Sequence, residues 1–269
     1  MDSDFNSASP RWYAFRVWAL PSEADGGDPR PLRPLSPLVL GHRGASALET
    51  ENTVEAFARA RADGADGVEL DVRLTGDGRM VVFHDDDLTR LGGDPARIAE
   101  TPFSRLRELR LSSGARIATL EEAYEAVGPD LMVNVELKME GVGGSLGVLV
   151  EAAAAVIERL GVGERTLVSS FNPWAVRRWM RRAPRIRAGY LFEGCSPLHA
   201  FTAAWLRPFA LNPELELCTP ARVARWRRRG AFVVVWTVDD PAALSACRAM
   251  GVAAIIANDP ARARAALSA

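Results

Sequence analysis

The sequence predicts a closed parallel (β/α)₈ TIM barrel with an added antiparallel hairpin strand after strand two. Short apolar runs alternate with helical patterns from residue 38 onward, and such alternation is typical of a parallel sheet built from βαβ units. Eight of these runs are joined through helices, which is the strand count of a TIM barrel, and 269 residues suit its size. One further run follows the second strand too closely for a parallel crossover.

The eight predicted barrel strands are short apolar runs, most of them rich in Val, Ile and Leu, which favour strands. In chain order they span residues 38–40, 68–73, 131–137, 166–170, 187–192, 209–211, 232–238 and 254–257.

Helix-start signals separate these strands. Thr119 followed by Glu122 has the spacing of a capping box, as does Asn52 followed by Glu55. Four later helices are predicted to begin at a proline that follows a capping residue, at Asn172, Thr219, Asp240 and Asp259. In the first helix, the predicted apolar stripe consists of Val54, Phe57, Ala58 and Ala62.

The added strand is predicted at residues 79–84. Only Thr75, Gly76, Asp77 and Gly78 separate it from strand two, so the connection must be a hairpin and residues 80–83 must run antiparallel to that strand. This pairing brings His84 close to Asp71 or Val72. Residues 86–118 lack long periodicity and are predicted to form an irregular excursion over one face.

Composition narrows the class of protein. The net charge is −1, from 33 basic and 34 acidic residues, so no global field favours nucleic acid or stable membrane insertion. Three cysteines at unrelated spacings indicate reduced thiols and a cytoplasmic protein. Residues 1–35, rich in proline and glycine, are predicted to be a poorly ordered tail before a catalytic domain at 36–269. The oligomeric state stays open.

Charged and polar residues gather where the predicted strands 38–40, 68–73 and 131–137 end, and TIM barrel active sites lie at these ends. Glu69 and Asp71 are two apart, so both leave the same face of their strand. Glu136 lies on the same face of the predicted strand 131–137 as Lys138. Three carboxylates offer hard oxygen ligands that suit one Mg²⁺ or Ca²⁺ ion.

Cations and imidazoles complete this set. Arg43 and Lys138 are the cations expected around a bound phosphate. His42 and His84 can exchange protons near neutral pH. The combination predicts metal-assisted phosphoester hydrolysis. Taken singly, each residue has a structural explanation, and Trp236 in particular is typical of a barrel core.

The sequence resembles the glycerophosphodiester phosphodiesterase family, whose fold is a distorted (β/α)₈ barrel. The resemblance implies that His42 and His84 form an acid/base pair. It also implies metal ligands at Glu69, Asp71 and Glu136, phosphate contacts from Arg43 and Lys138, and Trp236 beside the substrate. The matching segments are Gly41-His42-Arg43-Gly44, Glu51-Asn52-Thr53, Glu69-Leu70-Asp71, Val82-Phe83-His84-Asp85, Asn134-Val135-Glu136-Leu137-Lys138, Ser169-Ser170-Phe171, Trp236-Thr237-Val238 and Ile255-Ile256.

Three positions depart from the family pattern. Thr50 stands where the family usually has proline, and Ala257-Asn258 stand where it usually has Thr-Asp. The segment 211–214 lacks the aromatic or histidine that commonly follows its proline, which leaves substrate preference open. Glu51 has three candidate roles: support of Arg43, support of the metal, or favouring the following helix N-terminus.

The expected activity is metal-dependent hydrolysis of glycerophosphodiesters, such as glycerophosphocholine, to glycerol 3-phosphate and an alcohol. One alternative is a lysophospholipase D using the same site, with an apolar groove supplied by the tail or by residues 197–210. The other alternative is a catalytically silent barrel that binds a phosphate ligand. The metal can be Mg²⁺ or Ca²⁺, and the nucleophile can be water or a substrate hydroxyl.

Overall fold

A computed structural model describes residues 36–139 and 144–268. Its parallel barrel strands succeed one another in the order β1-β12-β11-β10-β9-β8-β7-β2, and the pairing of β1 with β2 closes the ring. The predicted TIM barrel is therefore confirmed, whereas the predicted tail lies outside the described residues. The strands are β1 (Leu38–Gly41), β2 (Gly67–Leu74), β7 (Met132–Leu137), β8 (Thr166–Ser170), β9 (Arg187–Phe192), β10 (Ala210–Pro213), β11 (Phe232–Val235) and β12 (Ala254–Ala257).

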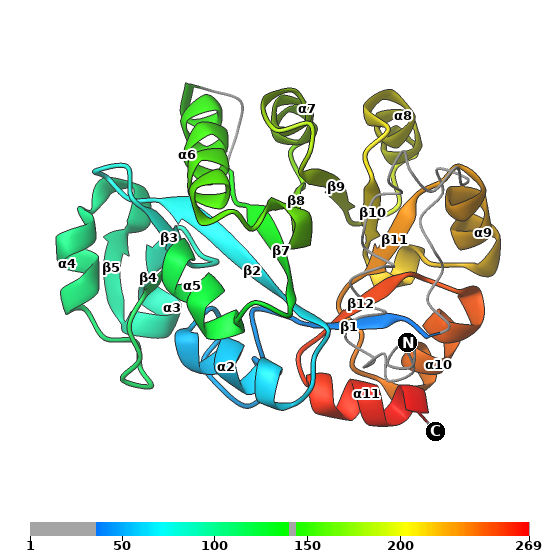
Figure 1. The fold of residues 1–269 in the computed structure, drawn as a ribbon, viewed down its shortest axis with the longest axis horizontal. Helices are drawn as coiled ribbons and strands as arrows, with labels where there is room; N and C mark the ends of the chain where they lie inside the picture. The colour runs from blue at the N-terminus through cyan, green and yellow to red at the C-terminus, as the bar shows by residue number, and fades with distance from the viewer. Residues whose placement is uncertain (1–35, 140–143, 269) are drawn as a thin grey trace, which may run out of the picture.

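Helices surround this barrel (Figure 1). They are α2 (Val54–Ala62), α5 (Leu120–Val127), α6 (Gly144–Leu160), α7 (Pro173–Arg182), α8 (Pro197–Leu206), α9 (Pro220–Arg228), α10 (Pro241–Met250) and α11 (Pro260–Ser268), with single 3₁₀ turns η3 (Gly163–Arg165) and η4 (Leu215–Leu217).

Side chains along each strand point alternately into the barrel and out toward the helices, so apolar residues form an inner core and an outer one. One core fills the lower barrel interior and includes Leu40, Met132 and Ile256. Outward-facing side chains such as Val68 and Val133 pack instead beneath the helices. Because the upper part of the interior is not filled in this way, it can hold polar side chains at the carboxyl ends of the strands.

The helix caps agree with the sequence except at α2. Thr119 and Glu122 form the predicted capping box, and Pro173, Pro220, Pro241 and Pro260 each begin a helix. At α2 the N-cap is Thr53, because Asn52 has a left-handed backbone (φ 59°) and turns its side chain elsewhere. The predicted stripe was wrong apart from Phe57, since the buried residues of α2 are Ala56, Phe57 and Ala60.

The hairpin prediction is confirmed. Strand β3 (Met80–Val82) pairs antiparallel with the upper part of β2, with Val72 opposite Val82. The backbone N–H of Phe83 donates to the carbonyl of Asp71 at 2.9 Å, so the chain reaches His84 beside Asp71. The first residues of β2 pair with β1 instead. Along this edge of β2, its partner therefore changes from β1 at the start of the strand to β3 at its end.

The stretch 86–118 is more ordered than the sequence predicted. It contains β4 (Asp87–Leu88), α3 (Thr89–Gly92), β5 (Asp94–Arg97), η2 (Ile98–Glu100), α4 (Phe103–Glu108) and the start of β6 (Ala118–Thr119), which pairs with β3. Strands β4 and β5 form a separate antiparallel sheet, and this unit lies at one side of the barrel (Figure 1). Its own small core includes Phe83, Leu88, Ile98 and Leu106. The apolar residues follow no helical or strand period because each element is too short to complete one.

None of the helices within the described ranges combines the length and apolar character needed to cross a bilayer.

Candidate functional site

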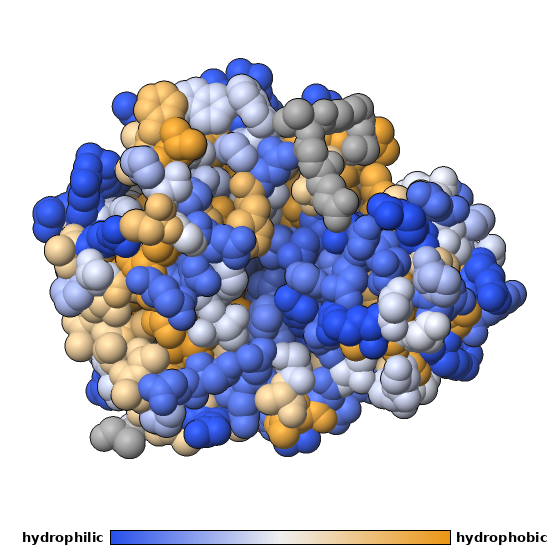
Figure 2. Space-filling view, turned by 180° about the vertical axis from the view of Figure 1, so that it is seen from behind, coloured by the Kyte–Doolittle hydropathy of each residue, from blue (hydrophilic) through white to orange (hydrophobic). Residues whose placement is uncertain are grey.

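A hydrophilic hollow opens near the middle of one face of the molecule (Figure 2). It is a cavity of about 280 Å³ at the carboxyl ends of the strands. Of the site residues predicted from the sequence, Asp71 alone is not part of its lining; it is almost completely buried. The cavity is lined by His42, Arg43, Glu69, His84, Glu136, Lys138, Phe171, Leu191, Glu193, Trp236 and Ile256.

A tight turn after β1 places His42 and Arg43 over the barrel. Gly44 has φ 87°, and a Cβ added to it would lie 2.6 Å from the backbone of Ala56, so glycine is required there. Arg43 itself has a left-handed backbone (φ 53°). Its N–H donates to the carboxylate of Glu69 at 3.1 Å, which fixes the turn against strand β2.

Three buried carboxylates converge from two adjacent strands. Asp71 on β2 lies opposite Glu136 on β7 in the sheet register. Oxygen atoms of Glu69, Asp71 and Glu136 all lie within 4.8 Å of one another. The structure therefore brings together the three carboxylates that the sequence analysis assigned to one site.

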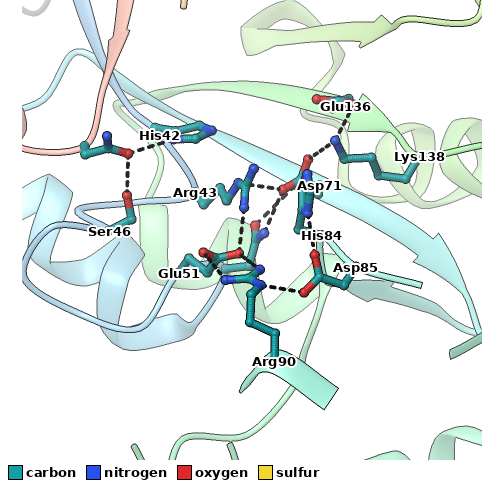
Figure 3. Close-up of polar contacts among 12 residues, drawn as sticks. His42, Arg43, Ser46, Glu51, Asp71, His84, Asp85, Arg90, Glu136 and Lys138 are labelled. Carbon is teal, nitrogen blue, oxygen red and sulfur yellow. Dashed lines mark hydrogen bonds and ion pairs between the residues drawn. The ribbon is translucent and has the colours of Figure 1, made fainter. Parts of the chain in front are cut away.

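Two cations are interleaved with these carboxylates (Figure 3). Lys138 Nζ lies 2.7 Å from Glu136 and 3.2 Å from Asp71. Arg43 Nε lies 3.3 Å from Asp71. Asn52 adds a third donor, since its amide donates to Asp71 at 2.8 Å and accepts the N–H of Asp71 in return. Asp71 is therefore the most fully compensated of the three.

The three carboxylates differ in pKa for this reason. Burial would raise the pKa of Asp71, but Lys138 and Arg43 outweigh it and lower that pKa. Burial and the charge of Asp71 raise the pKa of Glu69 well above its ordinary value. The same two effects raise the pKa of Glu136 to about 7 against the opposing charge of Lys138. A cation bound between them would relieve this repulsion.

His84 is held by a carboxylate. Its Nδ1 lies 2.7 Å from Asp85, and Arg90 Nε donates to the other oxygen of Asp85 at 2.7 Å. Arg90 also pairs with Glu51 at 2.6 Å, and Glu51 in turn accepts from Arg43 at 2.7 Å. This chain of ion pairs connects the excursion to the turn after β1 (Figure 3). Of the candidate roles of Glu51, the contacts favour support of Arg43.

His42 is held by an amide. Its Nδ1 lies 2.7 Å from Asn258 Oδ1, at the end of β12. Burial and the neighbouring charge of Arg43 lower the pKa of His42. For His84, burial also lowers the pKa, while the charge of Asp71 acts in the opposite direction.

Trp236 lies at the cavity wall. Its indole N–H donates to the carbonyl of Asn212 at 2.8 Å, and its ring meets Phe171 edge to face at 5.5 Å. Lys138 Nζ lies 5.9 Å from the centre of the Phe171 ring. Together these rings form an aromatic side to an otherwise charged cavity.

Sequence reasoning missed the residues that position others. Asp85 directly follows His84, and this adjacency was a usable signal. Asn52 was interpreted as a helix cap, and Asn258 only as a departure from a pattern. Arg90 had no signal, because its approach depends on the fold of the excursion.

Comparison with known proteins places this site in a family. The model of the glycerophosphoryl diester phosphodiesterase family matches residues 42–262. The chain belongs to this family. It is accordingly a phosphoric diester hydrolase. A glycerophosphodiester phosphodiesterase of Caldanaerobacter subterraneus subsp. tengcongensis is 33% identical over 83% of this chain and 94% of its own.

Solved structures of the family agree with the fold. The glycerophosphodiester phosphodiesterase of Thermotoga maritima superposes with a TM-score of 0.70 at 33% identity, covering 84% of this chain and 96% of its own. A phosphodiesterase of Oleispira antarctica, solved in complex with the product sn-glycerol-3-phosphate, gives a TM-score of 0.79 at 27% identity. It covers 87% of this chain and 98% of its own.

Proposed function

We propose that this enzyme hydrolyses glycerophosphodiesters to glycerol 3-phosphate and an alcohol, with one divalent cation held by Glu69, Asp71 and Glu136. The observation that carries the proposal is the convergence of three buried carboxylates, two cations and two histidines at one cavity, which all of them except Asp71 line. The relative from Oleispira antarctica binds sn-glycerol-3-phosphate as product, which supports a substrate of this class.

The carboxylates fit a hard cation. Oxygens on opposite sides of an ion are separated by about twice the bond length, ~4.2 Å for Mg²⁺ and roughly 4.6–5.2 Å for Ca²⁺. The oxygens of this cluster lie within 4.8 Å of one another, a bound that falls in the range for Ca²⁺, whereas Mg²⁺ would require the carboxylates to draw closer together. When bound, the cation would polarise a phosphate oxygen and neutralise developing charge.

The cations of the chain would bind the phosphate. Arg43 and Lys138 both line the cavity beside the carboxylates. Their positive charge would hold the phosphodiester and stabilise the added negative charge on its oxygens as the new bond forms. Trp236 and Phe171 would contact the apolar faces of the substrate.

The two histidines would divide the proton transfers. His84 bonds to the carboxylate of Asp85, which favours an imidazolium and therefore an acid. His42 contacts the amide of Asn258 rather than a carboxylate. Burial and the charge of Arg43 lower the pKa of His42, which favours a neutral imidazole and therefore a base. His42 would take the proton of the attacking group, water or a substrate hydroxyl, as its oxygen bonds to phosphorus. His84 would give a proton to the alcohol oxygen as its bond to phosphorus breaks.

A substrate panel tests this proposal. Glycerophosphocholine, glycerophosphoethanolamine and glycerophosphoglycerol would be compared, with released glycerol 3-phosphate as the measured product. Release from at least one of them at an enzymatic rate supports the proposal. Turnover of simple nitrophenyl phosphodiesters without release of glycerol 3-phosphate from any member would overturn it.

A second candidate activity is that of a lysophospholipase D. Exposed apolar side chains lie on and around α7 and α8, among them Trp174 (56% exposed) and Phe201 (73% exposed). Trp174 meets Trp205 edge to face at 5.2 Å, and the hydrophobic area beside the hollow at the upper left of Figure 2 lies in this region. Phe209, predicted to join such a groove, instead stacks on Phe232 at 5.3 Å against the barrel core.

Turnover of lysophosphatidylcholine against glycerophosphocholine separates the two activities. A higher kcat/KM on the lysolipid, lost in the Phe201→Ser variant, would favour the lysophospholipase activity. Family membership and the presence of both histidines at the cavity argue against a silent phosphate-binding barrel.

Arg43→Lys is expected to lower kcat/KM on glycerophosphocholine by about 10–100-fold. The guanidinium reaches Glu51 and Asp71 together and still lines the cavity. A lysine keeps the charge but loses the planar fork that holds two oxygens at once. The measurement is steady-state kinetics of the variant beside Arg59→Lys, a surface change on α2. A near-normal value for Arg43→Lys would assign Arg43 to a structural ion pair.

Glu136→Gln is expected to alter how thermal stability depends on pH. Because the folded protein without a cation holds the pKa of Glu136 at about 7, above its ordinary 4.5, folding binds a proton between these values. The contribution of protonated Glu136 to the free energy of unfolding is therefore fully present below pH 4.5 and is lost as the pH rises through about 7. Glutamine does not titrate. At pH 8 the chelated variant should melt about 5 °C above the chelated wild type.

Adding Mg²⁺ or Ca²⁺ should then raise the melting temperature of the wild type and not that of Glu136→Gln. The exposed Glu125→Gln change on α5 serves as the control. Equal melting temperatures of Glu136→Gln and wild type at both pH 5 and pH 8 would contradict the prediction.

A further inference from the structure

Asn258 is held by the carboxylate of Asp239, which does not line the cavity. Asp239 follows β11 and accepts two hydrogen bonds from Asn258. One comes from the backbone N–H at 2.7 Å and the other from the side-chain amide at 2.5 Å. On its other side, Asn258 Oδ1 lies 2.7 Å from His42 Nδ1 and accepts from Ser46 Oγ at 2.9 Å. Figure 3 shows His42 and Ser46 side by side at this point.

The donors and acceptors of this chain fix one another. An ionised carboxylate only accepts hydrogen bonds, so the NH₂ group of Asn258 must face Asp239. The amide oxygen must then face His42. Because that oxygen only accepts, Nδ1 of His42 must carry a proton, and Nε2 of the neutral ring keeps its lone pair.

We propose that Asp239 is a positioning residue for His42, acting through the amide of Asn258 to hold the ring in the tautomer whose Nε2 can accept a proton. The proposal rests on the proposed function in one respect, that His42 is the base. Asp239, Asn258 and His42 follow β11, β12 and β1, which are adjacent in the sheet, so three neighbouring strand ends build the relay.

The arrangement also separates the two histidines chemically. A carboxylate in direct contact with His42 would stabilise its protonated form, as Asp85 does for His84. Because Asn258 lies between Asp239 and His42, Asp239 orients the imidazole ring without its carboxylate contacting the ring directly. The other charged groups that act on His42 are Arg43, Asp71 and Glu51, and within the part of the chain that the structure describes none of them hydrogen-bonds to Nδ1.

Three variants test the relay. In Asp239→Asn, the new amide would accept the backbone N–H with its oxygen and turn its NH₂ toward Asn258. Asn258 would then present its oxygen to residue 239 and its NH₂ to His42, which forces the proton onto Nε2. We expect kcat/KM to fall about 10²-fold or more, because the base loses its lone pair.

The exchange Asp239→Asn with Asn258→Asp should restore the tautomer. The amide at 239 would donate to the carboxylate at 258, which would accept Nδ1–H of His42. Activity should recover at least tenfold over Asp239→Asn, with the acidic limb of the pH profile shifted upward because the ring now faces a charge. Asp240→Asn is the matched control, since Asp240 only caps α10 and asparagine caps equally well.

The tautomer is read directly from the ¹⁵N shifts of His42 Nδ1 and Nε2, with no dependence on activity. A proton on Nδ1 in wild type and in the exchanged protein, and on Nε2 in Asp239→Asn, supports the relay. An unchanged tautomer in folded Asp239→Asn would overturn it, as would an exchanged protein no more active than the single variant. A changed tautomer with normal kcat/KM would leave the relay standing and refute His42 as the base.

Discussion

His84→Ala is expected to lower kcat/KM on glycerophosphocholine by about 10²–10⁴-fold while sparing much of the activity on a nitrophenyl phosphodiester. A glycerophosphodiester releases an alkoxide, whose conjugate acid is very weak, so the oxygen must be protonated as its bond to phosphorus breaks. Nitrophenolate, with a conjugate-acid pKa of about 7, leaves without that help. The carboxylate of Asp85 at 2.7 Å is what makes His84 the better proton donor.

The measurement is the ratio of kcat/KM on the two substrates. His42→Ala should lose both activities, because the attacking group needs its base whichever group leaves. His199→Ala is the control for loss of an imidazole, since His199 lies on α8 and bonds to Tyr190 and to the carbonyl of Glu193. A leaving-group-dependent loss in His42→Ala would exchange the two roles. Equal losses in both variants on both substrates would show that neither is a simple leaving-group acid.

Asp71→Asn is expected to weaken cation binding by at least about 10²-fold and to reduce activity accordingly, while the barrel stays folded. The substitution keeps the size of the side chain and removes the one carboxylate of the cluster whose pKa is lowered by its cationic neighbours. The loss is therefore electrostatic rather than steric. Calorimetric titration with Mg²⁺ and with Ca²⁺ measures the affinity, and circular dichroism checks the fold.

Asp130→Asn, in the exposed turn before β7, is the matched control for this change. It should bind the cation as the wild type does. Wild-type affinity in Asp71→Asn would remove Asp71 from the metal site and leave it as the partner of Arg43 and Lys138.

The barrel was predictable because its signals are local. Strand periodicity, Pro at the first helical position and the four-residue turn before β3 each depend on a few neighbouring residues. The excursion was not predictable in the same way. Its core joins Phe83, Ile98 and Leu106 from elements of two to six residues, and such short elements leave no period to detect.

The site was predictable to the extent that barrel geometry gathers strand ends. Glu69, Asp71 and Glu136 meet because β2 and β7 are neighbours in register. The residues that hold the histidines were not predicted. Asn258 holds His42, and Asp239 holds Asn258, from positions more than 190 residues away along the chain. Asn52 left its expected capping role because its side chain bonds to Asp71 instead.

Release of glycerol 3-phosphate from glycerophosphocholine, before and after removal of divalent cations, tests the central claim most directly. The account predicts that chelated protein releases almost none and that Mg²⁺ or Ca²⁺ restores the rate, with a requirement for Glu69, Asp71 and Glu136. Undiminished release by fully chelated protein would contradict it.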